Sequence, residues 1–67
     1  MIAKVAVSAA LYAIDKPYSY TVPQELDVRP GMRVLAPFGR GNRMSEGVVL
    51  QLDSGEETKL KRIERRL

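Results

Sequence analysis

The chain has no cysteine, no histidine and no tryptophan among its 67 residues. The lack of cysteine and histidine excludes disulfides and the usual zinc sites, and it also excludes the usual catalytic triads. No run of about 18 apolar residues is present, so the sequence predicts no membrane-spanning helix. A domain this small buries only roughly 60% of the surface of its unfolded chain. Its stability must therefore come from a compact aliphatic core or from a neighbouring domain.

Motifs for nucleotide binding and catalysis are also lacking. There is no phosphate-binding loop with the pattern Gly-x-x-x-x-Gly-Lys followed by Ser or Thr, and Gly39-Arg40-Gly41 lacks the third glycine of a dinucleotide fingerprint. Asp53 with the Glu56-Glu57 pair fits a polar turn better than a carboxylate pair or a hard-metal site. We therefore expect no catalytic residue, no bound metal and no enzyme activity in this chain.

The net charge of the chain is small, but its charged residues are unevenly distributed along the sequence. The formal net charge is +3, and the first 28 residues are nearly neutral. Basic residues gather in the second half of the chain, at Arg29, Arg33, Arg40, Arg43, Lys59, Lys61, Arg62, Arg65 and Arg66. A basic surface favours polyanions, although so small an excess equally fits an ordinary solvated surface. Composition thus permits nucleic-acid binding without requiring it.

Hydrophobic periodicity predicts four strands, at residues 2–8, 18–22, 32–36 and 45–52. In the first of these, Ala3, Val5 and Val7 form the apolar face. Tyr18-Ser19-Tyr20-Thr21-Val22 is dense in aromatic and β-branched residues, which favour strands. Four strands separated by short breaks indicate a mainly β fold.

Breaker residues predict the connections. Residues 9–13 fit a short helical turn or a loop, and Asp15-Lys16-Pro17 marks a turn before the second strand. Pro30-Gly31 suits the centre of a type II turn, in which Gly31 supplies the positive φ. Residues 37–42 predict a loop, and residues 53–57 a polar turn.

The tail, residues 58–67, allows two structures. Leu60, Ile63 and Leu67 have helical spacing, whereas their long polar neighbours also fit an edge strand. We favour a strand, because a fifth strand would close the sheet. The prediction is a single domain over residues 1–67, a small OB-like β-barrel of about five or six short strands. Its basic end lacks a termination signal, which indicates a piece of a longer protein.

Aromatic residues are the candidates for stacking on bases of single-stranded nucleic acid. Tyr18 is the better surface candidate, whereas Tyr20 and Phe38 favour the core because so few aromatics are available; the fourth aromatic is Tyr12. Close approach of a ligand to the backbone would suit Gly39 and Gly41, although turn geometry explains both glycines equally well.

Two arginines beside this glycine-containing loop could contact phosphate. Arg40 and Arg43 flank it, although each fits a solvated side chain as well. The combination of an aromatic residue, a glycine loop and arginines carries more weight than any single member.

Four blocks of sequence, in order, resemble the start of the PriA-type primosomal replication-restart helicases (primosomal protein N′). They are Ala-Lys-Val-Ala-Val from residue 3, Lys-Pro-Tyr-Ser-Tyr-Thr-Val-Pro from residue 16, Val-Arg-Pro-Gly-Met-Arg-Val-Leu-Ala-Pro-Phe-Gly-Arg from residue 28, and Glu-Gly-Val-Val-Leu from residue 46. The resemblance implies a 3′ DNA-binding domain, the N-terminal fragment of a longer helicase. It implies recognition of the 3′-hydroxyl end of a nascent strand at stalled or branched replication forks.

The resemblance also implies the site residues. Tyr18 and Ser19 correspond to an aromatic–polar pair of the family's end-binding pocket, Gly39 to the glycine of the Pro-Phe-Gly turn, and Lys61 to a lysine near the end. Members of the family can carry an acidic residue where this chain has Ser19. A carboxylate would accept a hydrogen bond from the terminal hydroxyl more strongly than serine does, while serine can both accept and donate.

For the parent protein, the resemblance implies an ATP-dependent 3′–5′ DNA helicase acting in replication restart and primosome assembly in the cytoplasm. ATP, magnesium and zinc are expected only in the missing part of the parent. Expected partners are DNA with a 3′ end and forked DNA, and through the parent other primosome proteins and single-stranded DNA-binding protein. Two alternatives remain from the residues alone: a β-barrel that binds a protein through its sheet edge, and an RNA-binding module.

Overall fold

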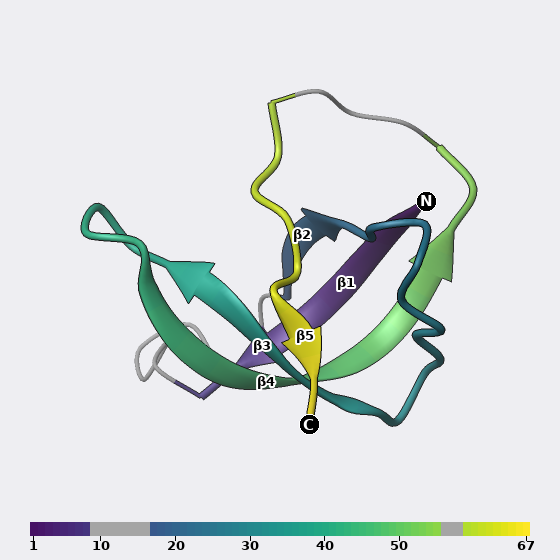
Figure 1. The fold of residues 1–67 in the computed structure, drawn as a ribbon, viewed down its shortest axis with the longest axis horizontal. Helices are drawn as coiled ribbons and strands as arrows, with labels where there is room; N and C mark the ends of the chain where they lie inside the picture. Colours follow the sequence, from purple (N-terminus) through teal and green to yellow (C-terminus); the bar gives the residue numbers. More distant parts are fainter. Residues whose placement is uncertain (9–16, 56–58) are drawn as a thin grey trace.

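The computed structural model describes residues 1–8, 17–55 and 59–67 and forms a mainly β fold, as predicted (Figure 1). Its strands are β1 (Ile2–Val7), β2 (Tyr18–Thr21), β3 (Arg33–Phe38), β4 (Arg43–Asp53) and β5 (Arg65–Arg66). They form one antiparallel sheet in the order β2-β1-β4-β3-β5. The described part of the chain contains no helix, and therefore none of the length and apolarity needed to cross a membrane. Tyr12, the expected structure at 9–13, Asp15 and Lys16, and the Glu56-Glu57 pair lie outside the described residues.

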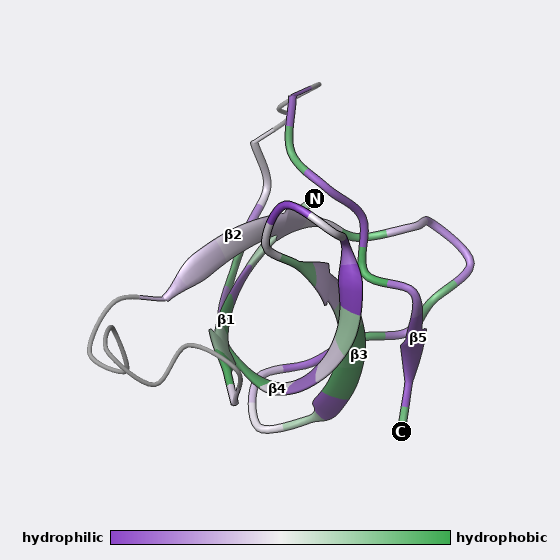
Figure 2. Cartoon of the chain, turned by 90° about the vertical axis from the view of Figure 1, so that its left-hand side faces the viewer, coloured by the Kyte–Doolittle hydropathy of each residue, from purple (hydrophilic) through white to green (hydrophobic). Residues whose placement is uncertain are grey.

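The segment before β5 closes the sheet into a barrel. The amide of Thr21 on β2 donates to the carbonyl of Lys61 at 2.8 Å, and the amide of Ile63 donates to the carbonyl of Thr21 at 3.0 Å. Two residues later the chain pairs with β3 as β5. In Figure 2, which looks along the barrel, β1, β4 and β3 curve around its axis, and this last segment runs down the right-hand side past β3 to the C-terminus. The predicted fifth strand is confirmed, although it is only two residues long.

The core is an aliphatic cluster with one tyrosine. Ala3, Val5 and Val7 are buried, so the apolar face predicted for the first strand is confirmed. The other buried hydrophobic residues are Tyr20, Val28, Val34, Ala36, Val49 and Ile63. Ile63 is 1% exposed and comes from the closing segment, so the same residues that close the barrel also fill it.

The Pro30-Gly31 turn has the predicted geometry. The amide of Met32 donates to the carbonyl of Arg29 at 3.1 Å, and Gly31 has a φ of +91°. A hydrogen bond between the first and fourth residues, with a positive φ at the third, defines a type II turn.

The predicted loop at residues 37–42 is wrong at its first two positions, because β3 continues through Pro37 and Phe38. These residues pair with Met44 and Arg43 of β4. Hydrogen-bonding direction alternates along an antiparallel strand, and the carbonyl of Leu35 accepts from Glu64 on the side away from β4. Pro37 faces that same side, so its missing N–H removes no hydrogen bond to β4. A proline at such an edge position is compatible with a strand.

Candidate nucleic-acid interface

The closing segment and β2 meet along a line that we call the seam of the barrel. A pocket lies where they separate on one side of Thr21. The closing segment pairs with β2 at Thr21, but its preceding residues diverge from the first three residues of β2. The resulting cavity of about 360 Å³ is lined by residues 18–20, 37–39 and 59–61. Four site residues implied by the resemblance, Tyr18, Ser19, Gly39 and Lys61, all lie in this lining. Arg40 and Arg43 lie on the adjoining β3–β4 connection and at the start of β4, outside the lining.

Three aromatic side chains form one wall of the pocket. The rings of Tyr18 and Phe38 meet edge to face, with centroids 5.0 Å apart and planes at 83°. Both side chains are half-buried against the core, so Phe38 is not the fully buried core residue that we expected. Tyr20 is 3% exposed, which agrees with the prediction of a core residue. The T-shaped contact holds the Tyr18 ring in one orientation at the pocket surface.

Tyr20 also ties the two strands of the pocket together. Its hydroxyl donates to the carbonyl of Pro37 at 2.9 Å. That carbonyl faces away from β4, as the alternation of β3 requires, so the hydroxyl satisfies an acceptor that the sheet leaves open. This contact sets the distance between β2 and the end of β3.

Burial raises the pKa of Tyr20 above its ordinary value of about 10, and the neighbouring Tyr18 raises it further. The folded protein therefore holds this proton more tightly than the unfolded chain does. Its contribution to stability is complete below about pH 10 and is lost as the pH rises through the higher folded pKa. We expect Tyr20→Phe to lower stability at neutral pH by about 1 kcal/mol, through loss of the hydrogen bond to Pro37, and to flatten the alkaline decline. Urea unfolding of both proteins between pH 8 and 11 measures this, and parallel declines would contradict it.

A hydrogen bond between Lys61 and Gly39 joins the closing segment to the end of β3. The Lys61 Nζ donates to the carbonyl of Gly39 at 2.7 Å. Gly39 has a φ of +77°, a conformation that favours glycine, and its carbonyl also accepts the amide of Asn42 at 3.1 Å across the turn. The turn therefore presents exposed backbone beside an ammonium group.

Ser19 lies at the rim. Its side chain is exposed, because it points to the face of β2 opposite the inward Tyr18 and Tyr20. Its hydroxyl has no hydrogen-bond partner among residues 1–8, 17–55 and 59–67. The described lining holds Lys59 and Lys61 and no carboxylate, so the pocket is locally positive.

The ion pairs between described residues lie outside the pocket lining. Outside the pocket lining, three arginines lie beside acids: Arg29 is 3.5 Å from Asp27, Arg33 is 2.7 Å from Glu46, and Arg62 is 3.9 Å from Glu25. Arg40 and Arg43 have no ion pair within the part of the chain that the structure describes.

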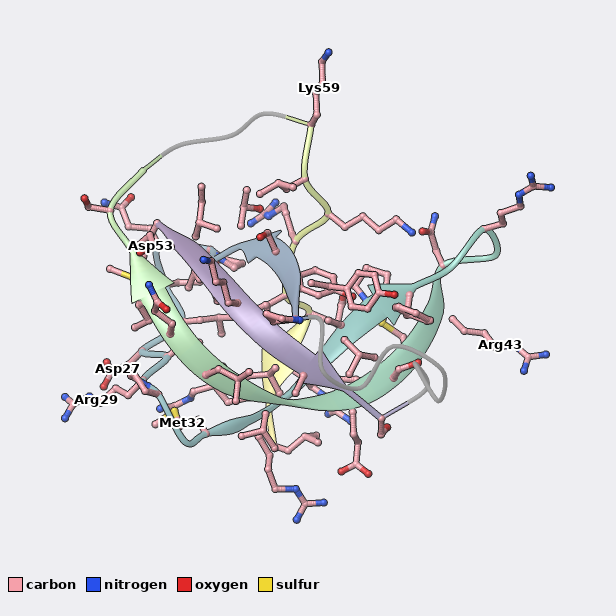
Figure 3. All side chains as sticks on the ribbon, turned by 180° about the vertical axis from the view of Figure 1, so that it is seen from behind. Asp27, Arg29, Met32, Arg43, Asp53 and Lys59 are labelled. Carbon is pink, nitrogen blue, oxygen red and sulfur yellow. The ribbon has the colours of Figure 1, made fainter. Side chains whose placement is uncertain are left out.

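The labelled charges can be compared in Figure 3. Arg43 and Lys59 extend away from the ribbon there, and the Arg29–Asp27 pair lies at the opposite end of the molecule from Arg43. Arg43, which pairs with Phe38 of the lining, and Lys59 therefore add positive charge near the pocket, which suits a polyanion.

No group of three His, Cys, Asp or Glu side chains that could hold a metal ion occurs in the described segments. Two features of the pocket were missed from sequence, the lining by Lys59 and Leu60 and the Tyr20–Pro37 hydrogen bond. The Lys59-Leu60-Lys61 alternation was the available signal for the first. No local signal predicts the second, because it depends on how β2 and β3 face each other.

Comparison with protein-family models gives a match over residues 4–67 to the PriA 3′DNA-binding domain (3′BD). The comparisons with curated proteins and with solved structures give no significant match. The family match covers nearly the whole chain, in agreement with the order of its sequence blocks and with its β-barrel. The chain belongs to the PriA 3′ DNA-binding domain family and is a module that binds DNA at 3′ ends.

Proposed function

We propose that the seam pocket binds the 3′-terminal nucleotide, with its hydroxyl, of a nascent DNA strand at a stalled or branched replication fork. Through this contact the domain orients an ATP-dependent restart helicase. The observation that carries the proposal is the convergence of Tyr18, Ser19, Gly39 and Lys61 from three distant segments on one cavity.

The chemistry of the lining supports a role for each residue. The Tyr18 ring, held by Phe38, offers a surface for the last base, and stacking on an aromatic ring tolerates any base. Lys61 supplies charge for the last phosphate, and the Gly39 backbone lets the sugar approach closely. The Ser19 hydroxyl can both donate to and accept from the terminal hydroxyl. Arg40 and Arg43 would meet phosphates further along the strand.

The shape of the seam supports end binding over binding along a strand. The backbone hydrogen bonds that join Thr21 to Lys61 and Ile63 close the seam beyond the pocket. A strand that enters between β2 and residues 59–61 therefore meets a closed end. The cavity of about 360 Å³ is at the small end of the roughly 300–1,000 Å³ typical of ligand sites.

The direct test compares short fluorescent DNA strands that end in a 3′-hydroxyl or in a 3′-phosphate. A second pair carries the hydroxyl or the phosphate at the 5′ end instead. We expect the 3′-phosphate to weaken binding roughly tenfold, because the closed seam leaves little room and hydrogen bonds to the hydroxyl are lost. The 5′ modification should change little. Equal affinity for the two 3′ ends would refute hydroxyl recognition and leave only general 3′-end binding.

Removal of the Lys61 charge should weaken this complex more than removal of an equal charge elsewhere. We expect Lys61→Gln to reduce affinity roughly three- to tenfold and to lower the slope of log affinity against log salt by about one. Arg65→Gln is the matched control, because Arg65 is exposed on β5 and does not line the pocket. Equal losses in the two variants would show that Lys61 acts only through net charge.

The role at forks makes a separate prediction. A fork whose nascent leading strand ends in a 3′-hydroxyl at the junction should bind more tightly than the same fork without that strand. In the helicase that carries the domain, the end-bearing fork should also be unwound in one preferred direction. Loss of this preference in a helicase with Tyr18→Ala would connect the pocket to orientation, whereas an unchanged preference would contradict the proposed role.

A further inference from the structure

The turn between β3 and β4 lies beyond the open side of the pocket. β3 runs antiparallel to β5, and the amide of Glu64 donates to the carbonyl of Leu35 at 2.7 Å. Further along β3, the carbonyl of Gly39 accepts the Lys61 Nζ at 2.7 Å. From Leu35 to Gly39 the chain therefore follows the closing segment away from its paired part and toward residues 59–61, where the pocket is open. The residues after Gly39 continue past the pocket.

These residues form the tip of a β-hairpin. The amide of Asn42 donates to the carbonyl of Gly39 at 3.1 Å, which closes a tight turn between the two strands. In Figure 1 this hairpin extends away from the rest of the barrel, on the left of the view. Residues 39–44 are all exposed, and a methyl group added at Gly41 would meet nothing within 4 Å. The tip therefore has space around it for a large ligand.

The charge of the tip is entirely positive. Arg40 and Arg43 are the charged residues of the segment 39–44, and neither forms an ion pair within the described part of the chain. The next acid along β4 is Glu46, which is paired with Arg33 at 2.7 Å. Arg40 lies between two glycines, so no neighbouring side chain crowds its guanidinium. The tip thus suits a polyanion that lies just outside the pocket.

We propose that this hairpin tip binds the duplex behind the 3′ end, with Arg40 on a phosphate of the template strand while Arg43 meets the nascent strand. This inference rests on the proposed function, since it requires the 3′-terminal nucleotide in the pocket. Behind that nucleotide the nascent strand is paired with its template, so a tip that projects past the pocket faces two strands. Their phosphates border a minor groove only about 6 Å wide, and two arginines on one tight turn can contact both of its edges.

The contact gives the domain a preference for a 3′ end at a junction over a loose 3′ end. A single strand offers phosphates to Arg43 alone, whereas a duplex with a free 3′ end offers them to both arginines. The preference does not depend on base sequence, because contacts to phosphates carry no sequence information.

The test uses the complete chain and one fluorescent strand with a 3′-hydroxyl, either alone or annealed to a template that leaves only its last nucleotides unpaired. A second template carries neutral methylphosphonates in place of the phosphates beside the junction, and a third carries them at its far end. We expect the annealed strand to bind roughly three- to tenfold more tightly than the single strand, and the neutral groups beside the junction to remove this gain. The same groups at the far end should leave the gain in place.

A side-chain variant tests the same contact from the protein side. Arg40→Gln should weaken binding of the annealed strand roughly three- to tenfold, lower its salt slope by about one and leave the single strand within about twofold. It should also bind the ordinary template and the template neutralised beside the junction equally, because the variant and the neutral groups remove one and the same contact. Arg65→Gln is the matched control, since Arg65 is exposed on β5 and outside the pocket lining, and it should keep the difference between the templates.

Equal binding of the two methylphosphonate templates by the unmodified protein overturns the inference, and so does an equal loss for the single and annealed strands in Arg40→Gln. If the 3′-hydroxyl still binds more tightly than the 3′-phosphate, the proposed function stands without it. If the hydroxyl and phosphate ends bind equally, hydroxyl recognition fails, and the comparison of templates then decides the hairpin contact by itself.

Discussion

Substitution of Tyr18 by alanine is expected to reduce affinity for a 3′-hydroxyl-ended strand by roughly ten- to a hundredfold. Stacking of one base on an aromatic ring contributes about 1–3 kcal/mol, and Tyr18 presents the half-buried ring at the pocket wall. The loss should appear mainly for strands with a free 3′ end. Fluorescence anisotropy with hydroxyl-ended strands of several sequences measures it.

Two variants separate stacking from folding. Tyr18→Phe keeps the ring and its edge-to-face contact with Phe38, so it should bind within about threefold of the unmodified protein. Leu50→Ala truncates an exposed apolar side chain of β4, outside the pocket lining, and controls for loss of apolar surface. Unchanged affinity of a folded Tyr18→Ala protein would remove Tyr18 from the binding site.

The second large effect concerns stability. Gly47 on β4 pairs with Val7 of β1 and with Val34 of β3 and is buried between them. A methyl group added there would lie 2.5 Å from the Val5 Cγ1 and 3.0 Å from the Ala6 carbonyl oxygen. Val5 is fully buried and the carbonyl belongs to the sheet backbone, so neither atom can move without disturbing the core.

We therefore expect Gly47→Ala to destabilise the domain by about 3 kcal/mol, the upper part of the usual range for overpacking. Folded domains have roughly 0.05–0.15 kcal/mol of stability per residue, so this is a large part of the total for so short a chain. Gly41→Ala is the matched control, because its added methyl meets nothing within 4 Å. It should change stability by less than about 0.5 kcal/mol. Urea midpoints measure both changes, and similar midpoints for the two variants would contradict the packing argument.

The strands were predictable because their signals are local. Alternation placed Ala3, Val5 and Val7 on the buried face, and Pro30-Gly31 specified its turn through the backbone preferences of these two residues alone. The predicted loop at Pro37 was wrong, because the effect of the missing proline N–H depends on which edge of the strand that position faces. That edge is defined by the register with β4, which the local sequence does not contain.

For the candidate site, too, the sequence identified the residues and the tertiary structure showed their arrangement. Tyr18, Ser19, Gly39 and Lys61 came from a resemblance in sequence order, whereas their shared pocket depends on the Thr21 hydrogen bonds that bring residues 59–61 beside β2. The half-buried position of Phe38 likewise follows from its contact with Tyr18 on another strand.

By itself, the sequence determined that this chain is a small, mainly β domain of the PriA 3′ DNA-binding family, because strand periodicity, turn residues and ordered motifs are properties of short segments. Only the tertiary structure decided that the seam closes at Thr21 and opens at Ser19. Closure depends on contacts between residues about forty positions apart, and their geometry follows from how the whole barrel packs.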